Sequence, residues 1–169
     1  MNRPSDASAG ENIRVLMVCM GNICRSPTAQ GVLEAKAVQA GVQDRLDIDS
    51  AGTHDYHIGK APDQRSQEHA AGRGYDLSQQ RARQLQARDF DDFDWILVMD
   101  EANEQAARRL CPPGQEHRLR RLSSFCLTHA TDVVPDPYYG GSDGFEQVLD
   151  LVEDACTGLL QFLFERQAD

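Results

Sequence analysis

The sequence predicts an α/β fold built on a parallel sheet, and three features of the chain indicate it. Apolar stretches of strand length alternate with segments of helical period along most of the 169 residues. The first two strands, at residues 15–18 and 46–51, enclose one helix, and such a unit forms a right-handed crossover between parallel strands. No linker or internal repeat divides the sequence, so we expect a single domain.

The predicted elements can be placed in order along the chain. We expect four strands, at residues 15–18, 46–51, 93–99 and 117–122. We expect four helices between and after them, at residues 27–40, 63–73, 101–110 and 145–166. Gly41 and Gly74 are placed to end the first two helices, and Asp100 is a suitable N-cap for the third. The last helix has one wide apolar face, which predicts that it packs on the sheet.

The composition limits the classes of function. The net charge is −10, and no basic tract offers a surface for nucleic acid. No apolar run reaches the roughly 20 residues of a membrane span, and residues 1–12 are small and polar, which predicts a flexible tail before a domain at residues 13–169. The five cysteines are odd in number and lack metal-binding spacing, so we expect a reducing, cytoplasmic environment.

The most informative stretch begins where the first strand ends, at Cys19, and reaches Arg25 six positions later. Glycine in this stretch permits close approach of the backbone, and asparagine tolerates left-handed dihedral angles better than most residues. A loop of this kind directs successive N–H groups at one anion, and the helix that follows adds its positive end. We expect the anion to be bound by the residues between the cysteine and the arginine, which are Met20, Gly21, Asn22, Ile23 and Cys24.

The residues at the end of this loop strengthen the prediction of an anion site. Arg25 adds a planar fork of donors that fits two oxygens of a phosphoryl group. Ser26, followed by Pro27 in the first helical turn, is a natural N-cap. The same positive field favours the thiolate of Cys19, which beneath a bound phosphoryl group is positioned as a nucleophile. A buried structural cysteine near a surface arginine is the competing interpretation of this spacing.

A second motif lies far downstream, at Asp136-Pro137-Tyr138-Tyr139-Gly140. Prolines hold the chain on both sides of the aspartate, so that its carboxyl group could protonate a departing phenolate from a fixed position. An aspartate that merely starts a turn is the alternative, because Asp-Pro often does so. Tyr138 could stack on an aromatic ring, and Tyr139 could help to line the entrance.

The segment Val18-Cys19-Met-Gly-Asn-Ile-Cys24-Arg25-Ser26-Pro27 and the downstream Asp136 motif together resemble the signature of the low-molecular-weight protein tyrosine phosphatases. The resemblance covers nearly the whole chain after residue 12, and it implies a single-domain three-layer α/β sandwich, in which a four-stranded parallel sheet carries helices on both faces. It implies hydrolysis of phosphotyrosine in proteins through a cysteinyl-phosphate intermediate, with free phosphate as a competitive ligand. Cys19 would then be the nucleophile, Arg25 the oxyanion ligand and Asp136 the general acid, without metal or other cofactor.

The resemblance also assigns supporting residues. Ser50 would help to hold the loop asparagine, Asn22, and Tyr56 occupies the place of a bulky pocket-wall residue. Gln80 stands where the family often has a histidine in the same network, and glutamine can still donate and accept hydrogen bonds. A plain strand-end serine and an exposed loop tyrosine are the competing interpretations of Ser50 and Tyr56. The five histidines share no ligand spacing, and we expect solvated or capping roles for them.

Three other functions remain open. An arsenate reductase on the same fold would need further cysteines near the anion loop, and residues 100–110 contain none. Protein arginine phosphatases carry threonine where this chain has Ile23, and isoleucine should crowd a guanidinium group. A phosphate-binding module without turnover would not need Cys19, Arg25 and Asp136 together. Within the loop, Cys24 also allows the hypothesis that oxidation forms a Cys19–Cys24 disulfide that protects the nucleophile.

Overall fold

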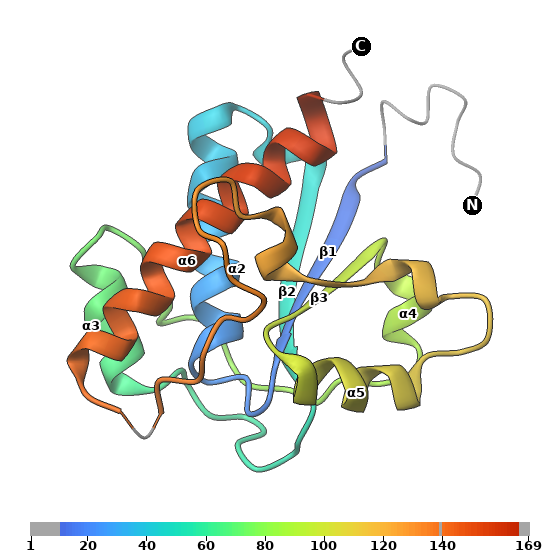
Figure 1. The fold of residues 1–169 in the computed structure, drawn as a ribbon, viewed down its shortest axis with the longest axis horizontal. Helices are drawn as coiled ribbons and strands as arrows, with labels where there is room; N and C mark the ends of the chain where they lie inside the picture. Colours follow the sequence, from blue (N-terminus) through green and yellow to red (C-terminus); the bar gives the residue numbers. More distant parts are fainter. Residues whose placement is uncertain (1–10, 139, 166–169) are drawn as a thin grey trace.

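The computed structural model describes residues 11–138 and 140–165 and contains the predicted parallel sheet (Figure 1). The strands lie in the order β2-β1-β3-β4, and every neighbouring pair is parallel. Their bounds are β1 Ile13–Cys19, β2 Leu46–Gly52, β3 Trp95–Val98 and β4 Leu119–Arg121. The fold class is therefore confirmed, while the predicted flexible tail falls almost entirely in residues 1–10, outside the described residues.

Helices cover both faces of the sheet (Figure 1). On one face lie α2, α3 and α6, with bounds Arg25–Ala40, Gln64–Ala71 and Ser142–Leu160. On the other face lie α4 and α5, with bounds Asp89–Asp92 and Glu101–Leu110. The remaining helical segments are η1 Gln43–Arg45, η2 Glu116–Arg118, η3 Leu122–Phe125 and the π-helical turn η4 Gln161–Glu165.

The alternating side chains of β1 explain why the sheet is covered on both sides. Val15 and Met17 belong to the core shared with α2 and α6, whereas Leu16 and Val18 belong to the core shared with α4 and α5. All four side chains are fully buried. Because successive residues of a strand point to opposite faces, an unbroken apolar run is what a central strand of a three-layer sandwich requires.

Several predicted element bounds were wrong by a few residues. The helix predicted at 63–73 covers only Gln64–Ala71, because the Asp63 side chain accepts hydrogen bonds from the N–H groups of Arg65 and Ser66 and so caps the helix from outside. The prediction that Gly74 ends this helix was also wrong, since its C-cap is Gly72. The last helix begins at Ser142, three residues earlier than predicted, and α4 was not predicted at all. The predicted end of the first helix is confirmed, since Gly41 adopts the left-handed φ of 75°.

The parallel sheet brings the functional segments to one edge. Val18 of β1 is in register with Val98 of β3, so Cys19, which ends β1, and Asp100, which follows β3, lie at the same carboxyl edge. Ligand sites of open α/β sheets form outside this edge of the strands. Within the described residues, no helix combines the length and apolar character needed to cross a bilayer.

Candidate active site

The sulfur of Cys19, the last residue of β1, lies at the floor of a pocket. The residue is only 2% exposed, and its Sγ is 3.1 Å from the hydroxyl oxygen of Ser26. The backbone N–H of Ser26 also donates to the sulfur, across 3.4 Å. Two donor groups at the start of α2 can therefore stabilise a negative charge on this sulfur, as the helix dipole also does.

The role predicted for Ser26 as an N-cap was wrong. The N-cap of α2 is Cys24, which makes no capping hydrogen bond through its side chain, and Ser26 lies within the first turn. Its hydroxyl group is engaged instead by Cys19 and by the amide of Asn22, which donates across 2.8 Å. The site uses this hydroxyl to hold the Cys19 sulfur, and Pro27 follows in the first turn as predicted.

Asn22 organises the anion loop in the left-handed conformation that the sequence suggested, with φ at 57°. Its amide nitrogen donates to the hydroxyl groups of Ser26 and Ser50, at 2.8 and 2.9 Å. Its oxygen accepts from the backbone N–H of Arg83 at 3.0 Å. The residue is 98% buried, and both polar atoms of its side chain are hydrogen-bonded, which keeps the loop in one conformation.

Two glutamines complete this network. The Ser50 hydroxyl donates to Gln30 Oε1 across 2.7 Å, and Gln80 Oε1 lies 3.4 Å away. The amide of Gln80 donates to the Pro27 carbonyl at 2.9 Å. Gln80 thus lies in the network where the resemblance placed it, without a titrating group. Gln30 was missed, although its position one turn after the loop, on the helix that packs on β2, could have indicated it.

Arg25 is held rigidly by groups that no local sequence signal indicates. Its Nη1 donates to Asp100 Oδ2 across 2.7 Å and to the Val134 carbonyl across 2.9 Å. The residue is 1% exposed, and burial alone would lower its pKa. The negative charges of Cys19 and Asp100 outweigh burial and raise the pKa of Arg25 above its usual value. The guanidinium group therefore stays charged beside the pocket.

Asp136 approaches the same arginine from the opposite loop. Its Oδ2 is 3.6 Å from Nη2 of Arg25, and its Oδ1 accepts from the backbone N–H of Tyr138 at 3.0 Å. The side chain is 35% exposed and lines the pocket. The carboxylate is thus anchored at one oxygen and faces the cavity, where it could exchange a proton with a ligand.

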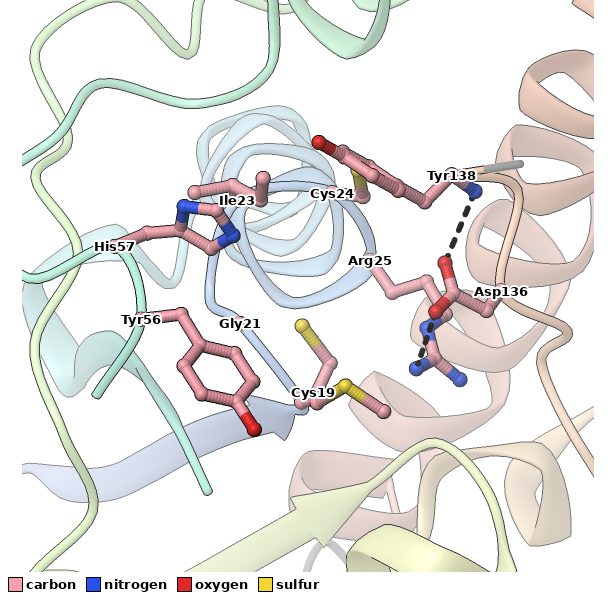
Figure 2. A pocket seen from close by; sticks show the side chains of 10 residues that line it. Cys19, Gly21, Ile23, Cys24, Arg25, Tyr56, His57, Asp136 and Tyr138 are labelled. Atoms are coloured by element: carbon pink, nitrogen blue, oxygen red, sulfur yellow. Dashed lines mark hydrogen bonds and ion pairs between the residues drawn. The ribbon is translucent and has the colours of Figure 1, made fainter. Parts of the chain in front are cut away.

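A cavity of about 160 Å³ joins these groups (Figure 2). In Figure 2, Tyr56 and His57 form one side of the pocket, while Tyr138 and Asp136 lie across from them above Arg25. The full lining consists of Cys19, Met20, Gly21, Ile23, Cys24, Arg25, Tyr56, His57, Asp136 and Tyr138. Tyr56 contributes to the wall although it is 66% exposed. The predicted site residue Tyr139 lies outside the described residues.

His57 corrects the expectation that every histidine has a solvated or capping role. Its ring lines the pocket and lies on the backbone of Gly21, where an added Cβ would come within 2.9 Å of the ring. The backbone of the same segment is tied to the anion loop, since the N–H groups of Thr53 and His54 each donate across 2.9 Å to the carbonyls of Cys19 and Met20. The contact between His57 and Gly21 depends on how the two loops fold together, so the spacing of the histidines in the sequence could not indicate it.

Close packing beneath the loop was also missed. A Cβ added at Gly52 would lie 2.8 Å from the carbonyl oxygen of Met20 and 3.1 Å from the nitrogen of Asn22. Real Cβ atoms do not approach backbone atoms so closely, so this position requires glycine. The sequence signal for this packing was a glycine directly after the predicted second strand; in the structure Gly52 ends β2 and is in register with Cys19 at the end of β1.

Comparisons with known proteins assign the chain to a family. The family model for low molecular weight phosphotyrosine protein phosphatases matches residues 14–168. A Streptomyces coelicolor low molecular weight protein-tyrosine-phosphatase is 42% identical, covering 90% of this chain and 94% of its own. The crystal structure of an Entamoeba histolytica protein tyrosine phosphatase is 38% identical with a TM-score of 0.89, covering 92% and 99% of the two chains. YfkJ from Bacillus subtilis is 35% identical with a TM-score of 0.87, covering 94% and 98%. The chain belongs to the low-molecular-weight phosphotyrosine protein phosphatase family.

Proposed function

We propose that this protein hydrolyses phosphotyrosine in proteins, by two phosphoryl transfers through Cys19 and without a metal ion. One observation carries the proposal: a buried sulfur that accepts from the start of a helix shares one pocket with Arg25 and Asp136. Nucleophile, oxyanion ligand and proton donor are the three groups that such a transfer needs. The family assignment supports the same reaction.

In the first step the thiolate of Cys19 attacks phosphorus from the pocket floor. The P–O bond to the tyrosine oxygen breaks, and Asp136, protonated, gives its proton to that oxygen. The guanidinium group of Arg25 and the N–H groups of the loop bind the equatorial oxygens. Since Arg25 is already fixed by Asp100 and Val134, the donors need little rearrangement as charge shifts during transfer.

In the second step a water molecule attacks the cysteinyl-phosphate. Asp136, now a carboxylate, takes a proton from that water, so the acid of the first step is the base of the second. The S–P bond breaks, and the electron pair returns to Cys19. The hydroxyl and N–H groups of Ser26 lie at 3.1 and 3.4 Å from the sulfur and stabilise the departing thiolate. Phosphate is released, and the enzyme is regenerated.

The shape of the pocket supports an aryl phosphate as substrate. Tyr56 and Tyr138 stand on opposite sides of the cavity, where they can flank a phenyl ring (Figure 2). Ile23 adds an apolar surface that offers no hydrogen bond to the guanidinium group of phosphoarginine. Phosphoserine is shorter than phosphotyrosine and would have to pass these walls to reach Cys19.

An oxyanion such as free phosphate should compete for this site. The Entamoeba histolytica structure has Hepes in its active site, and Hepes carries a sulfonate group of similar tetrahedral geometry. The proposal further places the activity in one domain over residues 13–169 and in a reducing compartment. All five cysteines are free, and the mechanism requires Cys19 to remain a thiolate.

The test is a panel of one peptide sequence carrying phosphotyrosine, phosphoserine or phosphoarginine, with arsenate plus thioredoxin as a fourth arm. We expect kcat/KM for the phosphotyrosine peptide to exceed that of the other peptides by at least about 100-fold, and no arsenate turnover. The Cys19→Ser variant is the control and should lose turnover while retaining phosphate binding. Faster hydrolysis of phosphoarginine, or full activity without Cys19, would overturn the proposal.

A further inference from the structure

The loop that carries Asp136 has no regular secondary structure, so its position depends on contacts with other elements. Before the aspartate, the Val134 carbonyl accepts from Arg25 at 2.9 Å, and the Val134 N–H donates to Met99 at 2.8 Å. After it, Nη2 of Arg65 donates to the carbonyl of Tyr138 across 3.0 Å. Arg65 therefore holds this loop on the C-terminal side of Asp136, whereas Arg25 and Met99 hold it on the N-terminal side.

Arg65 is in turn fixed by Asp63. The guanidinium group makes a two-point contact with this carboxylate, from Nε to Oδ1 at 3.2 Å and from Nη2 to Oδ2 at 3.0 Å. The backbone N–H of Asp63 donates to the carbonyl of Ile23 in the anion loop, across 2.8 Å. An unbroken chain of hydrogen bonds thus leads from Ile23, through Asp63 and Arg65, to Tyr138.

This chain ends on the catalytic carboxylate. The N–H of Tyr138 donates to Asp136 Oδ1, so the residue that accepts from Arg65 also orients the aspartate. The guanidinium carbon of Arg65 lies 5.4 Å from the centre of the Tyr138 ring and 4.8 Å from that of Phe145 in α6. Such distances are typical of cation–π contacts, which restrict the ring that forms one wall of the pocket.

We propose that Arg65 is a positioning residue for phosphoryl transfer, which sets Asp136 and the Tyr138 wall at the correct place relative to the anion loop. Its side chain is 44% exposed and is absent from the pocket lining, so it acts through Tyr138 and not on the substrate. Because a misplacement of about 1 Å can cost up to 100-fold in rate, loss of this contact weakens proton donation. The inference rests on the proposed function, since it concerns the same reaction.

The experiment compares Arg65→Gln with Arg73→Gln. Arg65 lies in the first turn of α3, and Arg73 lies just after the end of the same helix. Arg73 is a matched control, because it binds Glu146 and Glu153 of α6, at 2.7 and 3.0 Å, and not the Asp136 loop. For each variant, kcat/KM is measured on a series of aryl phosphates that runs from poor to good leaving groups, and Tm is recorded. Arg65→Lys keeps the charge but lacks the planar fork, and it should behave like Arg65→Gln in a weaker form.

Arg65→Gln should lower kcat/KM by about ten-fold for phenyl phosphate but by no more than about three-fold for p-nitrophenyl phosphate, because only the poor leaving group needs the proton in the transition state. Arg73→Gln should leave the ratio of kcat/KM for phenyl phosphate to that for p-nitrophenyl phosphate at the wild-type value while lowering Tm. Equal losses for both esters in Arg65→Gln, or the same ratio in both variants, would overturn the positioning role. Failure of the wild-type protein to hydrolyse any aryl phosphate would instead overturn the proposed function.

Discussion

The guanidinium group of Arg25 donates to the carboxylate of Asp100 across 2.7 Å, although the two residues are 75 positions apart. The same carboxylate caps α5, since its Oδ1 accepts from the N–H of Asn103 at 2.8 Å. One side chain at the carboxyl edge of the sheet thus orients Arg25 and starts α5 on the other face of the sheet. This contact joins the anion loop to the side of the sheet that α4 and α5 cover.

Asp100→Asn should separate these two tasks. Asparagine caps helices as well as aspartate does, so the N–H of Asn103 keeps its acceptor, while Arg25 loses a charge-assisted bond. We expect kcat/KM for a phosphotyrosine peptide to fall about ten-fold with little change in Tm. Asp100→Ala should lose as much activity and, in addition, about 1 kcal/mol of stability from the missing cap. Undiminished activity in Asp100→Asn would show that Arg25 needs no such anchor.

Asp136→Ala should reveal the proton donor. General acid catalysis contributes about 10² to 10⁴ in rate, and it matters most when the leaving group is poor. We expect kcat/KM to fall by at least about 100-fold for phenyl phosphate and far less for p-nitrophenyl phosphate. Asp132→Ala, on the same loop, is the control and should leave both values near those of the wild type. Uniform loss across the two esters would argue against Asp136 as the acid.

Cys24 allows a test of oxidative protection. Burial raises the pKa of Cys24 to about 12, so this residue is a neutral thiol at pH 7 and peroxide should oxidise Cys19 first. The resulting sulfenic acid can then condense with Cys24 to a disulfide, with loss of water. After brief exposure to peroxide, we expect dithiothreitol to restore the activity of the wild type but not of Cys24→Ser.

The raised pKa also sets the sign of the pH dependence. The thiolate fraction of Cys24 increases about ten-fold per pH unit below its pKa, so closure of the disulfide should be faster at pH 9 than at pH 6. The recoverable fraction of wild-type activity should therefore rise across this range at constant peroxide. If Cys24→Ser recovers as fully as the wild type, the two cysteines do not form the protecting bond.

Gly52→Ala should disturb the anion loop from below. The added Cβ meets backbone atoms of Met20 and Asn22, which cannot move without displacing the loop. Overpacking of this kind costs about 1–3 kcal/mol, so Tm should fall by several degrees, and kcat/KM should fall at least about ten-fold. Gly141→Ala is the matched control, because nothing lies within 4 Å of a Cβ added there. Wild-type activity in Gly52→Ala would contradict the tight packing.

Local sequence determined the central elements of this protein. Side-chain chemistry within a few residues predicts four features that the structure contains: the apolar run of β1, the left-handed conformation of Asn22, and the capping roles of Gly41 and Asp100. The resemblance then placed Ser50 and Gln80 in the network around Asn22. These features were predictable because each depends on neighbours in the chain or on a motif that spans the fold.

Only the tertiary structure determined which residues hold Arg25 and Tyr138 in place. The sequence offers many carboxylates for Arg25, and only the pairing of β1 with β3 brings Asp100 beside it. Arg65 reaches Tyr138, 73 residues further along the chain, because α3 packs on α6, the helix that follows Tyr138. Spacing identifies a reactive motif, since its geometry is local, but a partner distant in sequence depends on how the layers pack, and no short stretch of residues encodes that.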